Sequence, residues 1–365
     1  MSLDFAAVLT RMVEVNASDV HLTAGVPPVI RVRGRITPLE DYDALTPQDT
    51  REIVYSILND AQRKKFENQQ QLDFAYMIPG VARFRVNCFF QRGAISAAFR
   101  HIPEVIQGLD SLGLPLVMEE FTRKPRGFVL ITGPTGSGKS TTLASMIDMI
   151  NGEREEHILT IEDPIEFLHG HRKCIVNQRE IGADAIDFAT ALKGALREDP
   201  DVILVGEMRD LETISTALTA AETGHLVFAT LHTQSTAQTV DRIIDVFPPH
   251  QQQQVRMQLS IALQGIVTQQ LLPTADGSGR VVGAEVLIPT PAVRNLIREG
   301  KTHQIYSAIQ TSGSIGMQTM DAHLAQLVRM GKITRSLAEQ RASVPEELRR
   351  LLGGVQVAAV PAAAA

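Results

Sequence analysis

The sequence has little cysteine and no concentrated positive charge. Its two cysteines, Cys88 and Cys174, form no CxxC pair and lie among apolar residues, which predicts two small core residues rather than a zinc site or a disulfide. No Lys/Arg-rich run appears, and 35 basic against 41 acidic residues leave a formal charge of -6. Because a row of phosphates on a nucleic acid needs a basic surface, DNA and RNA are disfavoured as main partners.

Long apolar runs are also missing. No stretch reaches the roughly 18 uninterrupted apolar residues that suggest a membrane span. The first twenty residues carry acidic side chains within their apolar stretch and lack a small-residue cleavage site. We therefore expect a cytoplasmic protein without direct membrane insertion, whose membrane role comes through a partner.

The chain of 365 residues is long enough for two or three domains. Helical spacing up to Val13, a helix start at Thr46-Pro47, and alternation of Phe84, Val86 and Cys88 with polar neighbours predict a small α+β domain over residues 1–102. The prolines and glycines of residues 103–115 are typical of an interdomain linker.

After the predicted linker the pattern of apolar residues changes. The apolar runs GFVLIT, HILTI, DVILVG and HLVFAT alternate with segments of helical period, which predicts a mainly parallel sheet covered by helices on both faces. We expect this α/β domain over residues 116–350, with a hairpin around ADGSGR and further helices after it. The low-complexity tail, residues 351–365, is expected to be disordered.

The stretch GPTGSGKSTT fits GxxxxGK[ST] between a predicted strand and a predicted helix, which is the context that a phosphate-binding P-loop requires. Lys139 is expected to reach the β- and γ-phosphates of a nucleotide, and Ser140 to offer its hydroxyl to Mg²⁺. The expected nucleotide-binding residues are Gly133, Pro134, Thr135, Gly136, Ser137, Gly138, Lys139, Ser140 and Thr141.

Acidic residues follow two of the predicted strands. Asp163 and Glu166 come after HILTIE, and Glu207 after DVILVG. Since ligands collect at the carboxyl ends of parallel strands, we expect these carboxylates beside the phosphates; spacing alone leaves open which one is the base. His225 and His232 flank the strand HLVFAT and are expected near the same sheet edge, where a neutral imidazole would bond a phosphate or a carboxylate.

These motifs together resemble a known family. GPTGSGKSTT, ILTIEDPIE, LREDPDVILVGEMRDLET and TGHLVFATLHT are similar to the Walker A motif, Asp box, atypical Walker B motif and His box of the secretion ATPases that drive type II secretion and type IV pili. The segment AVRNLIREG, residues 292–300, resembles the AIRNLIRE signature of the members that retract pili, with Val293 in place of isoleucine.

The resemblance implies a PAS-like amino-terminal domain, a RecA-like ATPase domain, and ATP with Mg²⁺ as cofactors. It implies that Glu166 is the general base and that Glu207 acts on the Mg²⁺ shell, to which Asp163 also belongs. His225 and His232 would sense the nucleotide state. Arg85 and Arg100 would enter the active site from the amino-terminal domain, while the roles of Arg83 and Arg92 stay open.

The resemblance further implies a homohexamer that acts with the pilus machinery and an inner-membrane platform protein, at the inner face of the cytoplasmic membrane. The absence of an extra amino-terminal domain and of a four-cysteine insertion favours pilus retraction and twitching motility over assembly. Three alternatives stay open: a paralogous accessory pilus ATPase, a DNA-translocating ring, and a module that binds nucleotide only as a signal.

Overall fold

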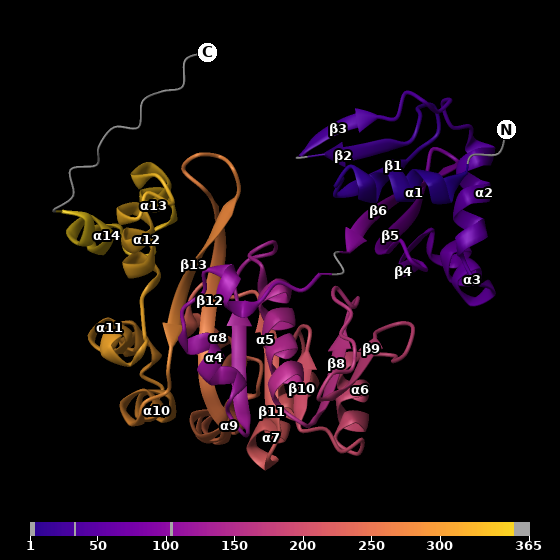
Figure 1. Ribbon diagram of the computed structural model, residues 1–365. Helices are drawn as coiled ribbons and strands as arrows, with labels where there is room; N and C mark the ends of the chain where they lie inside the picture. The colour runs from indigo at the N-terminus through magenta and orange to yellow at the C-terminus, as the bar shows by residue number, and fades with distance from the viewer. Residues whose placement is uncertain (1–3, 33, 103–104, 354–365) are drawn as a thin grey trace. The chain divides into compact units, whose positions relative to one another are not determined.

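The computed structural model describes residues 4–32, 34–102 and 105–353. Two compact units are present: the first comprises the chain up to Val105 together with Pro164–Leu168, and the second comprises Ile106–Asp163 and the chain from His169 onward. The predicted order, an α+β unit followed by a unit with a mainly parallel sheet, is confirmed (Figure 1). Over the described ranges, no helix combines the length and apolarity that a bilayer span requires.

An antiparallel sheet forms the centre of the first unit. Its strands lie in the order β3-β2-β1-β6-β5-β4. Thr46 caps α2 and Pro47 opens it, as predicted, and the alternation along β5 buries Phe84, Val86 and Cys88. The elements are α1 (Phe5–Glu14), β1 (Asp19–Leu22), β2 (Val29–Val32), β3 (Arg35–Pro38), α2 (Pro47–Ile57), α3 (Asp60–Gln69), β4 (Gln71–Ile78), β5 (Ala82–Gln91) and β6 (Ala94–Ile102).

A sheet with strand order β13-β12-β7-β11-β10-β8-β9 forms the centre of the second unit. Neighbouring strands from β12 to β9 run parallel, and β13 pairs antiparallel with β12 across the predicted hairpin. The elements up to the last strand are α4 (Val117–Thr122), β7 (Gly127–Thr132), α5 (Lys139–Glu153), β8 (His157–Glu162), β9 (Ile175–Glu180), α6 (Phe188–Ala195), β10 (Val202–Val205), α7 (Leu211–Thr223), β11 (Leu226–Leu231), α8 (Thr236–Asp245), α9 (Pro249–Ala262), β12 (Leu263–Pro273) and β13 (Arg280–Leu287).

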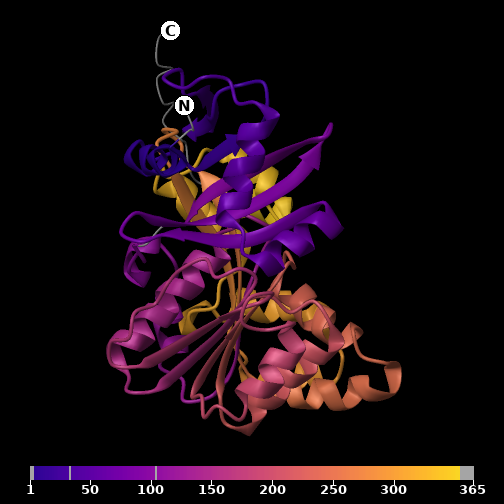
Figure 2. The same ribbon diagram turned by 90° about the vertical axis from the view of Figure 1, so that its right-hand side faces the viewer.

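Helices cover both faces of this sheet (Figures 1 and 2). Successive residues of β7 enter opposite cores, because side chains alternate along a strand. Phe128 and Leu130 pack with residues of α6, α7 and α8, whereas Val129 and Ile131 pack with residues of α4 and α5. Burial on both faces explains why these strands are continuous apolar runs in the sequence.

The segments at the two ends of the second unit are more ordered than the sequence indicates. In the expected linker, the described residues include a 3-10 helix, Leu109–Leu112, whose Leu109 is buried in the core with α5. Helix α14 continues to Leu352, which is buried, so the expected tail overlaps a helix; residues 354–365 lie outside the described part. The helices after β13 are α10 (Pro291–Arg298), α11 (Ile305–Thr311), α12 (Met320–Arg329), α13 (Arg335–Arg341) and α14 (Pro345–Leu352).

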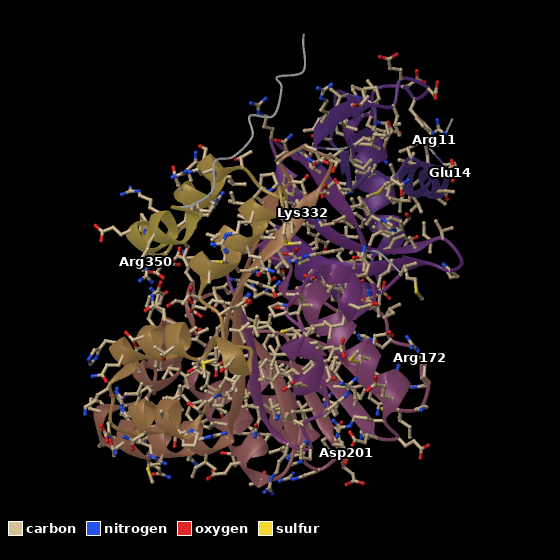
Figure 3. The ribbon with its side chains drawn as sticks, turned by 60° about the vertical axis from the view of Figure 1, so that its left-hand side comes forward. Arg11, Glu14, Arg172, Asp201, Lys332 and Arg350 are labelled. Carbon is tan, nitrogen blue, oxygen red and sulfur yellow. The ribbon has the colours of Figure 1, made fainter. Side chains whose placement is uncertain are left out.

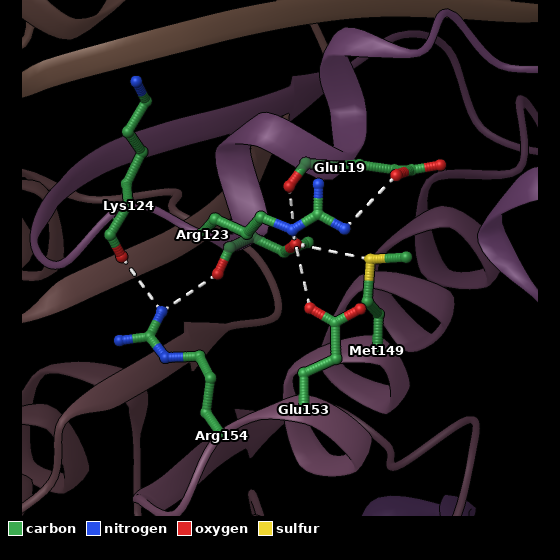
Figure 4. A network of polar contacts seen from close by, with 7 residues as sticks. Glu119, Arg123, Lys124, Met149, Glu153 and Arg154 are labelled. Carbon is green, nitrogen blue, oxygen red and sulfur yellow. Dashed lines mark hydrogen bonds and ion pairs between the residues drawn. The ribbon is translucent and has the colours of Figure 1, made fainter.

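Arg154 ties the end of α5 to the segment that enters β7 (Figure 4). Its Nη1 donates to the carbonyl oxygens of Thr122 at 2.9 Å and Lys124 at 3.0 Å, and its Nη2 donates to Glu156 Oε1 at 2.6 Å. Thr122 Oγ1 in turn lies 3.4 Å from Met149 Sδ. The strand before the P-loop and the helix after it are thus joined at the ends remote from the loop.

The close packing of β12 on α4 predicts that one added methyl group at Gly265 destabilises the fold. A Cβ on Gly265 would lie 2.3 Å from the ring of Phe121, which is 1% exposed. We expect Gly265→Ala to lower the free energy of unfolding by about 1–3 kcal/mol, because the buried ring has to move. Urea denaturation measures this, with Gly279→Ala as the matched control, since nothing lies within 4 Å of its Cβ. Equal stability of the two variants would contradict the packing argument.

Candidate active site

The P-loop lies between β7 and α5, and two of its glycines are required by its geometry. Gly133 has φ of 139°, and a Cβ there would lie 2.1 Å from the backbone oxygen of Gln269. Gly138 has φ of 88° and is the N-cap of α5. The loop therefore turns its backbone toward the amino-terminal end of α5, where free N–H groups and the helix dipole favour an anion.

Lys139 and Ser137 are the polar side chains that the loop encloses. Lys139 is 9% exposed, and its Nζ donates to the carbonyl oxygens of Gly133 at 2.9 Å and Pro134 at 3.1 Å. Ser137 Oγ is buried and has no hydrogen-bond partner among the described residues. A loop without room for a Cβ at Gly133, a buried ammonium and an unsatisfied hydroxyl fit a nucleotide's phosphate groups.

Gln269 supports the loop from β12, and sequence reasoning missed it. This residue is 1% exposed. Its Nε2 donates to the carbonyl oxygen of Ser137 at 2.8 Å, and its Oε1 accepts from Thr142 Oγ1 at 3.1 Å. The available signal was an amide within the apolar run GIVTQQLLP, since a buried amide needs partners that the run itself does not offer.

The strand order brings the P-loop and three of the predicted side chains to one edge of the sheet. Strands β7, β11, β10 and β8 are neighbours. Directly after β7, β11 and β8 come the P-loop, His232 and Asp163, and Glu207 follows β10 after Gly206. Glu166 lies further along the segment that begins with Asp163. Because carboxyl ends of parallel strands share an edge, the groups expected to handle phosphate and metal meet there.

Glu207 is the centre of a charged cluster at this edge. His232 Nε2 lies 3.1 Å from Glu207 Oε1, and Arg209 Nη2 donates to Glu207 Oε2 at 2.7 Å. The hydrogen bond from Arg209 lowers the pKa of Glu207 despite the opposing effect of burial, so the carboxylate is ionised at neutral pH. The cluster borders a cavity of about 600 Å³ lined by Glu207, Met208, Arg209, Leu231, His232, Thr233, Gln234, Gln238 and Arg242.

His225 lies at the opposite edge, and the expectation that both histidines lie near the same edge is wrong. Residue 226 pairs with Gly127 at the start of β7, whereas residue 231 pairs with Thr132 beside the P-loop. The Nδ1 atom of His225 lies 3.0 Å from the carbonyl oxygen of Ala220. The next residue, Leu226, donates from its backbone N to the carbonyl oxygen of Asp201, which directly precedes β10 and is labelled in Figure 3. A strand of six residues spans about 20 Å, so within one chain His225 does not reach the P-loop.

Arg85 and Arg100 face one side of the sheet in the first unit. They are directly paired across β5 and β6, and side chains of paired residues share a face. Arg100 Nε donates to Asp19 Oδ1 at 2.9 Å, while 68% of the Arg100 side chain stays exposed. Burial acts against ionisation of Asp19, but hydrogen bonds from Ser18 and Arg100 lower its pKa overall. Two guanidinium groups are thus presented together, and one is oriented by a carboxylate.

The other two arginines lie differently. Arg83 is on β5, two residues before Arg85 and therefore on the same face. Arg92 follows the end of β5 and has φ of 50°, so it belongs to the turn before β6 rather than to a strand face. Over the described residues, no group of three or more His, Cys, Asp and Glu side chains could hold a metal by protein ligands alone.

A family model described as type II/IV secretion system protein matches residues 104–343. The chain belongs to this family. It is 53% identical over 344 residues to the type IV pilus retraction ATPase PilT of Pseudomonas aeruginosa, a match that covers 94% of this chain and 99% of that protein. It is 43% identical over 350 residues to the type IV pilus ATPase PilU of the same organism, covering 96% and 91%.

Among solved structures, the chain is similar to the pilus retraction motor PilT with bound ADP. The two have a TM-score of 0.90 and 52% identity, and the match covers 95% of this chain and 99% of that one. Similarity of this extent includes both units described above. A fold that binds ADP in a relative supports the assignment of the P-loop as a nucleotide site.

Proposed function

We propose that this chain is an ATP-hydrolysing motor that powers type IV pilus retraction and thereby twitching motility. The observation that carries the proposal is the 53% identity to PilT along nearly the whole of both chains, together with an intact P-loop whose lysine, serine and glycines are all present. The first unit is the PAS-like domain and the second the RecA-like ATPase domain, joined near residues 103–115.

Each group at the carboxyl edge has a role in hydrolysis. The N–H groups of the P-loop and Lys139 bind the β- and γ-phosphates. Ser140, Glu207 and Asp163 would hold Mg²⁺, partly through water, and Mg²⁺ supplies neutralisation of phosphate charge when bound. Glu166 takes the proton of the attacking water. His232, bonded to the ionised Glu207, changes partner when the charge at the phosphates changes.

The arginines of the PAS-like domain complete the site of a neighbouring subunit in a ring of six. A guanidinium group that approaches the transition-state charge accelerates phosphoryl transfer strongly. The direct pairing of Arg85 with Arg100 supports this role, since both would arrive together. Closure of these arginines on ATP and their release after hydrolysis would rotate the domains and act on a platform protein at the inner face of the cytoplasmic membrane.

An accessory pilus ATPase is the second candidate, because PilU is also similar over nearly the whole chain. Identity favours the retraction ATPase, at 53% against 43%. A DNA-translocating ring is disfavoured by the charge of -6. Filter binding to duplex DNA at physiological salt distinguishes that class.

The function is tested by complementation with the wild-type chain and with a variant that lacks the proposed general base. In a piliated bacterium that lacks its retraction ATPase, we expect the wild-type chain to restore twitching and Glu166→Gln to fail. The purified Glu166→Gln variant should bind ATP with wild-type affinity but lose at least about 10²-fold in kcat, because the amide accepts no proton. Normal turnover by Glu166→Gln would remove the base assignment. Failure of the wild-type chain to restore twitching would contradict pilus retraction as its function.

A further inference from the structure

One side chain connects the two ends of the catalytic segment, defined as residues 163–168, which carries Glu166. This side chain is Gln178, on the neighbouring strand β9, where it is paired with Thr160 of β8. Its amide bonds the residue before the segment and the residue after it. The motifs discussed above do not include it.

The entry to the segment is fixed at Glu162. Glu162 Oε1 accepts from Thr160 Oγ1 at 2.6 Å and from Gln178 Nε2 at 3.2 Å. Its backbone oxygen accepts from Ile181 N at 2.9 Å, which continues the pairing of β8 with β9. The carboxylate is thus held by donors on its own strand and on the next one.

The exit from the segment is fixed by the same amide and by α5. His169 N donates to Gln178 Oε1 at 2.8 Å. Asn151, 1% exposed on α5, donates from Nδ2 to the carbonyl oxygen of Gly170 at 2.7 Å and accepts from Arg172 N at 3.2 Å. Arg172 is labelled in Figure 3. The segment therefore leaves β8 and returns to a site anchored on the helix that begins at the P-loop.

The polarity of these bonds requires an amide at position 178. Glu162 supplies an acceptor and His169 supplies a donor, so the bridging group has to donate in one direction and accept in the other. A carboxylate at 178 would retain the bond from His169 N and place two negative charges together. An apolar side chain would leave the partly buried N–H of His169 without this partner.

We propose that Gln178 is a positioning residue for ATP hydrolysis, which holds both ends of the catalytic segment so that Glu166 stays aligned with the attacking water. The inference rests on the proposed function, since Glu166 matters only if ATP is hydrolysed. Misplacement of a catalytic group by about 1 Å costs on the order of 10²-fold in rate. Loss of the bridge thus lowers kcat and leaves nucleotide binding at the P-loop intact.

The experiment compares Gln178→Leu with Asn177→Ala. Asn177 is the adjacent residue on β9, and its Nδ2 lies 3.0 Å from His157 Nε2, at the other end of β8. We expect Gln178→Leu to lower kcat by about 10- to 100-fold with unchanged ADP affinity, and Asn177→Ala to keep wild-type kcat. A kcat of Gln178→Leu within twofold of wild type, or a parallel loss of ADP affinity, would overturn the inference.

Hydrogen exchange gives a readout independent of turnover. Amides of residues 163–173 should exchange faster in Gln178→Leu than in wild type, and at the wild-type rate in Asn177→Ala. Unchanged exchange in Gln178→Leu would overturn the inference even if the wild type is an active ATPase. An inactive wild type with faster exchange in Gln178→Leu would instead overturn the proposed function and leave the bridge established.

A polarity swap adds a rescue test. Gln178→Glu alone should lose kcat as Gln178→Leu does. In the double variant Gln178→Glu with Glu162→Gln, the amide at position 162 donates to the carboxylate at position 178. That carboxylate still accepts from His169 N. We expect the double variant to recover at least tenfold in kcat over Gln178→Glu; a double variant no faster than the single one contradicts the bridge.

Discussion

Lys139→Ala is expected to abolish ATP turnover, with a loss of at least about 10³-fold in kcat/KM. Two effects add up. The variant removes the ammonium that would stabilise charge on the β- and γ-phosphates in a water-poor site. It also leaves the carbonyl oxygens of Gly133 and Pro134 without the donor that now lies 2.9 and 3.1 Å away, so the loop loses part of its internal support.

The measurement is steady-state ATPase activity together with ADP binding by calorimetry. Lys139→Arg is the matched control for charge, because it keeps the positive charge but carries a planar fork that does not fit the same cradle. We expect it to retain nucleotide binding better than Lys139→Ala while remaining slow. Wild-type turnover in Lys139→Ala would mean that this loop is not the site of ATP hydrolysis.

Arg100→Ala subunits are expected to slow mixed rings, because each altered subunit removes the turnover of one active site. A guanidinium group that stabilises the transferred phosphoryl contributes about 10³ to 10⁵ in rate. Each altered subunit would therefore silence the active site of the neighbour that its arginine enters, while its own site stays complete as long as the subunit that serves it is wild type. The homogeneous variant should lose at least about 10³-fold in kcat with nucleotide affinity nearly retained, because the missing contact acts in the transition state.

Titration of Arg100→Ala into wild-type protein measures this, with Arg35→Ala as the control. Arg35 is an exposed arginine on the edge strand β3 of the same sheet, and its variant should leave mixed activity unchanged. Mixed rings that keep full wild-type activity would contradict the entry of Arg100 into an active site. Equal turnover per chain after dissociation into single subunits would contradict it as well.

The local features of the fold and the site were predictable from the sequence because their causes are local. The capping of α2 by Thr46 depends on the next few residues. The apolar run of β7, followed by glycines and Lys139, contains the turn and helix start that bind phosphate. Arg85 and Arg100 lie on successive strands joined by a short turn, and the register pairs them directly.

Tertiary structure alone decided which residues meet across the sheet. His225 and His232 lie at the two ends of β11, and the parallel pairing with β7 decides that His232 is the one beside the P-loop. Gln269 supports the P-loop from β12, far along the chain. Gln178 supports the catalytic segment from β9, the strand that pairs with β8. Hydrogen bonds between strands depend on strand order and register, which are set by packing of the whole core and leave only a weak trace in the sequence around each residue.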